Sequence, residues 1–312
     1  MSVRVLVAGD ANLDLVLQGD VRPRFGQAEQ LLSDANLVLG SSAGICASGL
    51  ARLGVQVGLV ARVGEDLFGT HTRRLLAERG VDVTELGTTP APTGLSVILS
   101  AATDRSILTL PGAMAELGVD AVRTALARSG STHLHVASFF LVPAFARDLP
   151  GLLADVRASG VTISLDPNWD PREEWSGVAE CLPYVDVLLP NAAEAVELAG
   201  VAGGTRIPDA VSAARVLASR GPVVAVKDGA AGGFVVAAEE LLRAPGLTVD
   251  VVDTTGAGDS FDAGFLAAWL EDRGPAESLA WAVAAGSLST TGAGGTGRQA
   301  TRDELLAALG RP

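Results

Sequence analysis

Apolar runs of strand length alternate with stretches of helix length along most of the chain. Many of these runs are continuously apolar, which is typical of strands covered on both faces. The predicted strands span residues 4–8, 56–63, 133–137, 162–166, 185–190, 223–227, 233–236 and 247–252. The predicted helices span residues 43–53, 67–79, 119–128, 152–159, 192–199, 209–219, 260–271 and 277–289. This alternation predicts an α/β fold with a doubly wound, mostly parallel sheet flanked by helices.

Two stretches, residues 12–39 and 93–110, instead alternate between apolar and polar positions. Such alternation is typical of half-exposed strands. We therefore expect a single domain over residues 1–312, with these two stretches forming a small β-sheet lid inserted in it. The glycine-rich residues 200–205 are expected to form a surface loop.

Composition and charge narrow the class of protein. Hydrophobic residues make up 48% and charged residues 19%, as in a globular domain. The net charge of −13 argues against nucleic acid or anionic membrane as a partner. Two distant cysteines, Cys46 and Cys181, indicate neither a disulfide framework nor a zinc site. Without a signal peptide or an apolar run of membrane-spanning length, we expect a cytoplasmic protein.

The chemistry concentrates in residues 253–265, between a predicted strand and a predicted helix. Gly256 and Gly258 let the backbone approach a ligand closely, and the free amides of a helix start attract an anion. Asp259 lies inside that site and would repel a phosphate unless it takes a proton from an attacking hydroxyl. The pattern therefore suggests phosphoryl transfer to an alcohol. A glycine-rich turn that only caps a helix is the alternative.

Residues 253–265 resemble, position by position, the C-terminal signature of the ribokinase-like (PfkB) carbohydrate kinases. The resemblance extends over essentially the whole chain and implies a ribokinase-like fold. It implies that Asp259 is the catalytic base. It also implies that the amides of Gly256, Ala257 and Gly258 hold the transferred phosphoryl group.

Sugar-binding candidates follow the first strand. Asn12 and Asp14 stand at the carboxyl edge of the predicted sheet, where ligands bind in open α/β folds. Asp14 could accept bonds from two hydroxyls, and Asn12 could donate and accept. An Asx-rich turn is the alternative. The spacing of the two residues also matches the start of ribokinase-like sugar kinases.

Residues 40–54 resemble the N-terminal signature of the same family, so Gly40, Ser41 and Ser42 are expected at the sugar site. Ser41 replaces the second glycine of that signature, and Ile45 stands where an asparagine is usual. Ile45 implies a drier wall and leaves the identity of the sugar open.

Nucleotide-binding candidates lie in the second half of the chain. Asn191 and Glu194 have the spacing of a capping box. The resemblance instead implies an asparagine near the nucleotide phosphates and a glutamate that holds magnesium through water. Lys227, Gly229 and Gly232 resemble the nucleotide-phosphate hairpin of the family, with an ordinary β-turn as the alternative.

Several further residues are candidates for supporting or structural roles. Asp166 and Asn168 follow a predicted strand whose end, by the resemblance, faces the nucleotide, and they are supporting candidates. Arg105 is either an anion-binding residue or an exposed lid arginine. Val283 replaces an asparagine that often approaches the adenine, which leaves nucleotide preference open. His133 and His135 alternate on a strand, which favours a structural role.

The glycine-rich residues 289–297 suit a hard cation through exposed carbonyl groups. The resemblance implies a monovalent-cation site made by Asp253, Thr255 and carbonyls of the loop. The carbonyls in question are those of Ser289, Gly292 and Gly294. An empty flexible loop is the alternative.

The sequence thus predicts an ATP- and Mg²⁺-dependent sugar kinase, with K⁺ as a further cation. It would transfer the γ-phosphoryl group to a hydroxyl, expected to be primary, of a small carbohydrate or sugar acid. A nucleoside kinase of the same fold is the first alternative, against which the scarcity of aromatic residues counts. A non-catalytic sugar or nucleotide sensor is the second, against which Asp259 counts. The lid is the expected surface if the chain forms a homodimer.

Overall fold

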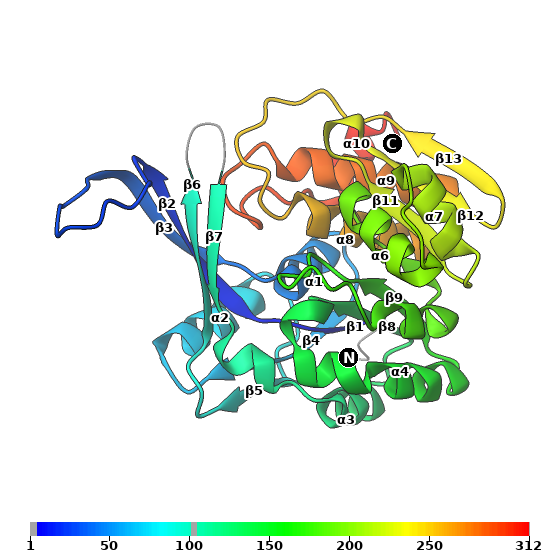
Figure 1. Cartoon of the computed structure of the whole chain (residues 1–312), viewed down its shortest axis with the longest axis horizontal. Coiled ribbons are helices and arrows are strands. Elements are labelled where there is room, and N and C mark those ends of the chain that lie inside the picture. Colours follow the sequence, from blue (N-terminus) through cyan, green and yellow to red (C-terminus); the bar gives the residue numbers. More distant parts are fainter. Residues whose placement is uncertain (1–4, 101–104, 312) are drawn as a thin grey trace.

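The computed structural model describes residues 5–100 and 105–311 and contains two β-sheets (Figure 1). The larger sheet has nine strands in the order β13-β12-β11-β10-β9-β8-β1-β4-β5. Its strands are β1 (Val5–Ala8), β4 (Val57–Gly64), β5 (Leu86–Thr89), β8 (His133–Ala137), β9 (Thr162–Asp166), β10 (Val187–Leu188), β11 (Val223–Lys227), β12 (Gly233–Ala237) and β13 (Glu240–Ala244). All neighbours from β5 to β11 are parallel, whereas β12 and β13 are antiparallel. The predicted mostly parallel sheet is confirmed.

Helices cover both faces of this sheet. One face carries α1 (Ser42–Arg52), α2 (Leu67–Glu78), α8 (Ala257–Trp269), α9 (Gly274–Ser289) and α10 (Arg302–Ala308). The other carries α3 (Val119–Ser129), α4 (Pro143–Ala158), α5 (Val178–Cys181), α6 (Ala192–Gly203) and α7 (Ala210–Ala218). Short 3₁₀ turns lie at Gly112–Glu116, Phe139–Leu141, Leu182–Tyr184 and Gly229–Ala231. Both faces are therefore buried, which explains why the central strands are continuously apolar.

The smaller sheet has the order β3-β2-β6-β7 and projects from one side of the main body (Figure 1). Its strands are β2 (Asn12–Gly19), β3 (Leu32–Leu39), β6 (Gly94–Ser100) and β7 (Arg105–Leu110). All four fall in the two stretches whose alternation predicted half-exposed strands. Ile107, Leu108 and Leu110 on β7 are more than half exposed. A lid function, and a homodimer through this sheet, remain predictions.

The strand predicted at residues 247–252 is wrong. Its apolar side chains are not buried, and Val251 and Val252 are 61% and 65% exposed. The backbone instead turns to the end of α9, where the amides of Val252 and Asp253 both donate to the Thr290 carbonyl. The edge strand of the sheet is β13. It was not predicted because its charged residues interrupt the apolar run.

Several boundaries also differ. Helix α6 continues to Gly203 and ends at Gly204 in the left-handed region, so most of the predicted loop 200–205 is helical. Helix α4 begins at Pro143, because proline is favourable at a first helical position, well before the predicted residue 152. Helix α10 was not predicted. Strand β10 is reduced to two residues, and residue 4 of the first predicted strand lies outside the described residues.

The cysteines and the helix lengths bear on the class of protein. Cys46 and Cys181 are both buried and free. Within residues 5–100 and 105–311, no helix has the length and apolar character needed to cross a membrane.

Candidate active site

Helix α8 begins three residues earlier than predicted, so Asp259 lies in its first turn. Gly256 precedes the helix with φ of 70°, in the region that favours glycine. A Cβ atom at Gly256 would also lie only 2.6 Å from Cα of Gly295. The amide of Ala257 makes a long bond of 3.3 Å to the Thr254 carbonyl. The turn has the geometry of an anion site at a helix N-terminus.

Asp259 is partly exposed and faces helix α1, where the Ser42 side chain forms a hydrogen bond with it. Burial and the negative charge of Asp166 raise the pKa of Asp259 to about 8, while Lys227 and Ser42 act in the opposite direction. A carboxylate with this pKa can accept a proton near neutral pH. The structure therefore brings the predicted base next to one predicted sugar-site residue.

The other sugar-site candidates lie close together at the root of the small sheet. Asn12 donates from Nδ2 to Asp14 Oδ1 at 3.1 Å and to Ser96 Oγ at 3.3 Å. Burial and the charge of Asp10 raise the pKa of Asp14 to about 7. A side chain at Gly40 would overlap the Asp14 carboxylate and displace it, so glycine leaves this carboxylate its observed position.

Ser41 and the unpredicted Asp10 hold the start of helix α1. The Ser41 hydroxyl accepts a bond of 3.0 Å from the Gly44 amide, so it is already used as a helix cap. The buried Asp10 carboxylate accepts from the amides of Ser42 and Ala43 at 3.3 and 3.0 Å. Asp10 lies two residues before Asn12 at the same sheet edge. This spacing could have identified Asp10 as a candidate site residue.

Asn191 and Glu194 form the capping box at the start of α6. The Glu194 amide donates to Asn191 Oδ1 at 2.9 Å, and the Asn191 amide donates to Glu194 Oε2 at 2.8 Å. Burial and the charge of Asp166 raise the pKa of Glu194 to about 7. The interpretation of Asn191 and Glu194 as a capping box is confirmed. It does not exclude their nucleotide and magnesium roles, which remain predictions.

Lys227, at the end of β11, lies next to Asn191 through a backbone bridge. Its ammonium donates to Asp166 Oδ2 at 2.8 Å and to Asp262 Oδ2 at 2.9 Å. Its Cδ lies 3.3 Å from the position of a Cβ at Gly258, so its stem passes beneath the first turn of α8. In this structure Lys227 is directed toward two carboxyl groups.

The predicted hairpin after Lys227 is present, because β11 and β12 pair antiparallel. Gly229 and Gly232 lie in its turn with φ of 55° and 91°. The backbone of the turn therefore requires glycine on conformational grounds, and contact with nucleotide remains a prediction.

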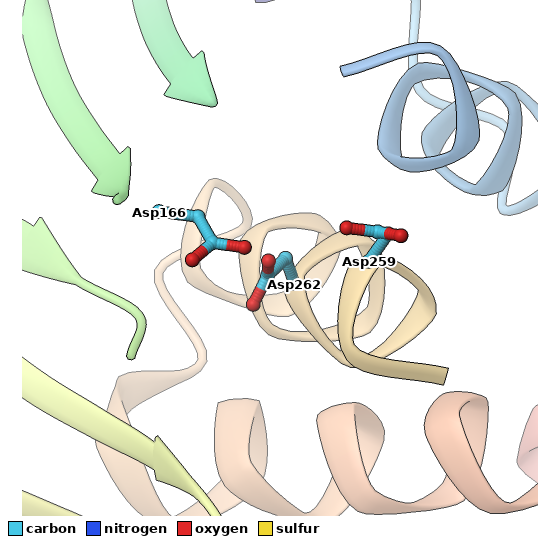
Figure 2. A group of neighbouring side chains, drawn as sticks. All are labelled: Asp166, Asp259 and Asp262. Carbon is cyan, nitrogen blue, oxygen red and sulfur yellow. The ribbon is translucent and has the colours of Figure 1, made fainter. Parts of the chain in front are cut away.

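Figure 2 shows Asp262 between Asp166 and Asp259. Oxygen atoms of the three carboxyl groups lie within 4.8 Å of one another. That spacing could hold a metal ion, but the Lys227 ammonium already contacts two of the three groups. Sequence reasoning gave Asp262 no role, although an acidic residue three positions after Asp259 in an otherwise apolar helix was a usable signal.

Asp253 joins two loops beside the turn at Gly256. Its carboxylate accepts from the Thr255 amide and hydroxyl at 2.9 and 2.7 Å, and from the Gly294 amide at 2.8 Å. Burial opposes ionisation of Asp253, but these bonds outweigh it and lower its pKa. The contact between Gly294 and Asp253 is thus made by the amide of Gly294, which donates to the carboxylate. Cation binding by the carbonyls of Ser289, Gly292 and Gly294 remains a prediction.

Three other residues have clear surroundings. Ile45 packs against Gly295, so the residue found in place of the usual asparagine supports the loop next to Gly256. Val283 is buried on α9. Arg105 on β7 donates to Thr255 Oγ1 at 3.1 Å, which links the small sheet to the same loop.

Comparison with known proteins adds independent information. Residues 4–302 match the model of the pfkB family of carbohydrate kinases. An ATP-dependent ribose-1-phosphate kinase from Halopiger xanaduensis is 32% identical, over 98% of both chains. A fructokinase from Klebsiella pneumoniae is 31% identical over 99% of this chain and 100% of its own. A ribokinase from Haemophilus influenzae is 29% identical over 98% of both chains.

Solved structures confirm the ribokinase-like fold. A ribokinase from Thermotoga maritima superposes with a TM-score of 0.84 at 26% identity, covering 100% of both chains. A ribokinase II from Escherichia coli in complex with ATP and Mg²⁺ has a TM-score of 0.85 at 23% identity, covering 99% of this chain and 100% of its own. The chain belongs to the PfkB family of carbohydrate kinases and is a phosphotransferase that uses an alcohol group as acceptor.

Proposed function

We propose that the chain transfers the γ-phosphoryl group of ATP to a hydroxyl group, primary by expectation, of a small sugar or sugar acid. The observation that carries the proposal is Asp259 in the first turn of α8, next to Gly256 and with a pKa of about 8. Relatives over nearly the whole length act on ribose 1-phosphate, ribose and fructose by name, which supports a sugar as the acceptor.

In this mechanism Asp259 takes the proton of the attacking hydroxyl. The amides of the first turn of α8 stabilise the charge that develops on the transferred group. Asn12 and Asp14, on the first strand of the small sheet, hold hydroxyls of the sugar and direct one of them toward Asp259. Mg²⁺, held through water by Glu194, would screen the phosphate charge when it is bound.

The substrate can be identified by measuring ADP release with a panel of acceptors. The panel contains ribose, fructose, ribose 1-phosphate, 2-dehydro-3-deoxygluconate and several nucleosides. We expect ATP turnover with at least one sugar or sugar acid. Turnover with nucleosides alone would support a nucleoside kinase instead, and binding without turnover would support a sensor.

Asp14→Asn is expected to weaken sugar binding strongly. Loss of a charged hydrogen-bond acceptor costs roughly 1.5–3 kcal/mol, or about 10- to 150-fold in KM for the sugar. The variant should also stabilise the free protein. The folded pKa of about 7 lies above the usual aspartate pKa of 3.8, so ionisation of Asp14 destabilises the fold progressively as pH rises between these values.

Steady-state kinetics and thermal melts at pH 8 measure both effects of Asp14→Asn. Asp34→Asn, at an exposed position on β3 of the same sheet, is the matched control and should change neither. An unchanged KM for the sugar in Asp14→Asn would contradict the assignment.

Activity is expected to require Mg²⁺ and to rise when K⁺ replaces tetramethylammonium at fixed ionic strength. A divalent ion must screen the phosphates of ATP, because a protein of net charge −13 offers no general attraction for them. A monovalent cation near Asp253 would fix the turn at Gly256. Equal rates in both buffers would remove the monovalent site and leave the role of Asp259 untouched.

A further inference from the structure

Three titratable side chains behind Asp259 have no part in the mechanism above: Asp166, Lys227 and Asp262. Lys227 contacts both Asp166 and Asp262, and neither carboxyl group is exposed to solvent. With both carboxyl groups ionised, two negative charges would face one positive charge in an environment that solvates charge poorly. One proton held between the two carboxyl groups would remove this imbalance.

The hydrogen-bond donors around each carboxyl group indicate which one holds the proton. Asp166 accepts from the Asn168 amide at 3.2 Å, from Asn168 Nδ2 at 2.9 Å and from Lys227. Asp262 accepts from Lys227 through Oδ2, and its buried Oδ1 has no hydrogen-bond partner among the described residues. Donors favour the ionised form, so Asp166 is the carboxylate and Asp262 is the acid.

We propose that Asp262 carries a proton on Oδ1 and donates it to the carboxylate of Asp166, which makes Asp166, Lys227 and Asp262 a neutral unit. The Asp166 and Asp262 side chains are hydrogen-bonded to each other. Because Asp262 Oδ2 accepts from Lys227, the unpartnered Oδ1 is the oxygen left to carry the proton. Burial raises the pKa of Asp262 well above its usual range, in the direction this arrangement requires.

The location of this proton matters for the base. Asp259 lies within the same 4.8 Å cluster, and a second negative charge about 5 Å away would raise its pKa by on the order of two units. The ionised fraction of Asp259 at pH 7 would then fall from about one in ten to on the order of one in a thousand, leaving little base to accept a proton from the sugar. Asp262 is thus a positioning residue that fixes Lys227 and Asp166 and keeps Asp259 usable. This consequence rests on the proposed function.

Asp262→Asn tests the proposal by kinetics. An asparagine has the shape of the neutral acid, can donate to Asp166 and can accept from Lys227. We expect kcat within about threefold of the wild type and an unchanged acid limb of the pH profile, because the variant removes no charge. Asp262→Leu cannot donate, and kcat should fall roughly tenfold. A shift of the Asp262→Asn limb by more than about one unit to lower pH would show that Asp262 is ionised, and would overturn the proposal.

Infrared spectroscopy tests the same proton without catalysis. About one pH unit above the pKa of 8 of Asp259, that residue, Asp14 and Glu194 are largely ionised. We expect a carbonyl band of a protonated carboxylic acid that Asp262→Asn loses and the exposed control Asp303→Asn keeps. Labelling aspartate with ¹³C assigns the band to an aspartic acid in the unmodified protein. Because burial also raises the pKa of Asp10, the loss of the band in Asp262→Asn identifies which aspartate holds the proton.

A missing band, or one that Asp262→Asn does not change, would overturn the proposal even if Asp259 proves to be the base. Conversely, the band would persist if the proposed role of Asp259 failed. The two experiments therefore separate the location of the proton from the function of the site.

Discussion

Asp259→Asn should lower kcat by at least about 10²–10⁴-fold, because an amide cannot accept the proton of the attacking hydroxyl. The wild-type rate should itself rise with pH. Below the pKa of about 8, each pH unit reduces the ionised fraction of Asp259 about tenfold in the free enzyme. A pH profile of kcat/KM measures this limb, which the variant should lack.

The melting temperature distinguishes loss of the base from loss of the fold. The pKa of Asp259 is raised from the usual aspartate value of 3.8, so its ionisation destabilises the folded protein progressively as pH rises toward 8. Asp259→Asn should therefore melt at a higher temperature than the wild type above pH 8. A variant that retains kcat within threefold would remove Asp259 from the mechanism.

Lys227→Met should destabilise the protein by about 3–5 kcal/mol, because it leaves buried carboxyl groups without their cation. The free energy of unfolding from urea titrations at neutral pH measures this loss. The loss should shrink in acid, where protonation of Asp166 removes the uncompensated charge.

Arg123→Met is the matched control for Lys227→Met. It breaks an ion pair with Asp155 in which both side chains are about half exposed, and such pairs contribute about 0–1 kcal/mol. Equal effects of the two substitutions would show that the buried cluster is not a significant source of stability.

The pattern of apolar residues predicted the parts of the fold that are buried on both faces. Strands β8, β9 and β11 have the predicted bounds, because each is enclosed between two helical layers. Strand β13 was not predicted, whereas residues 247–252 were wrongly predicted to form a strand. Both lie near the surface, where the polarity of a segment no longer indicates whether its backbone pairs.

The arrangement of the candidate site was predicted where it depends on residues close in sequence, as in the turn at Gly256 with Asp259 and the pair Asn12 and Asp14, while the roles of these residues remain predictions. It was missed where the partner lies far along the chain. Asp262 on α8 contacts Lys227 and Asp166, which come from β11 and β9 of the large sheet. Only the fold brings these three side chains together.

The residues proposed to bind the sugar and those proposed to activate it belong to different sheets. Asp14 lies on β2 of the small sheet, whereas Asp259 lies on α8 against the large one. Only three residues separate β1 of the large sheet from β2, so the joint between the two sheets lies within the site itself. In the proposed mechanism, the angle at this joint would set the distance between the acceptor hydroxyl and Asp259. A substitution at the joint can therefore change the rate without touching the sugar or ATP.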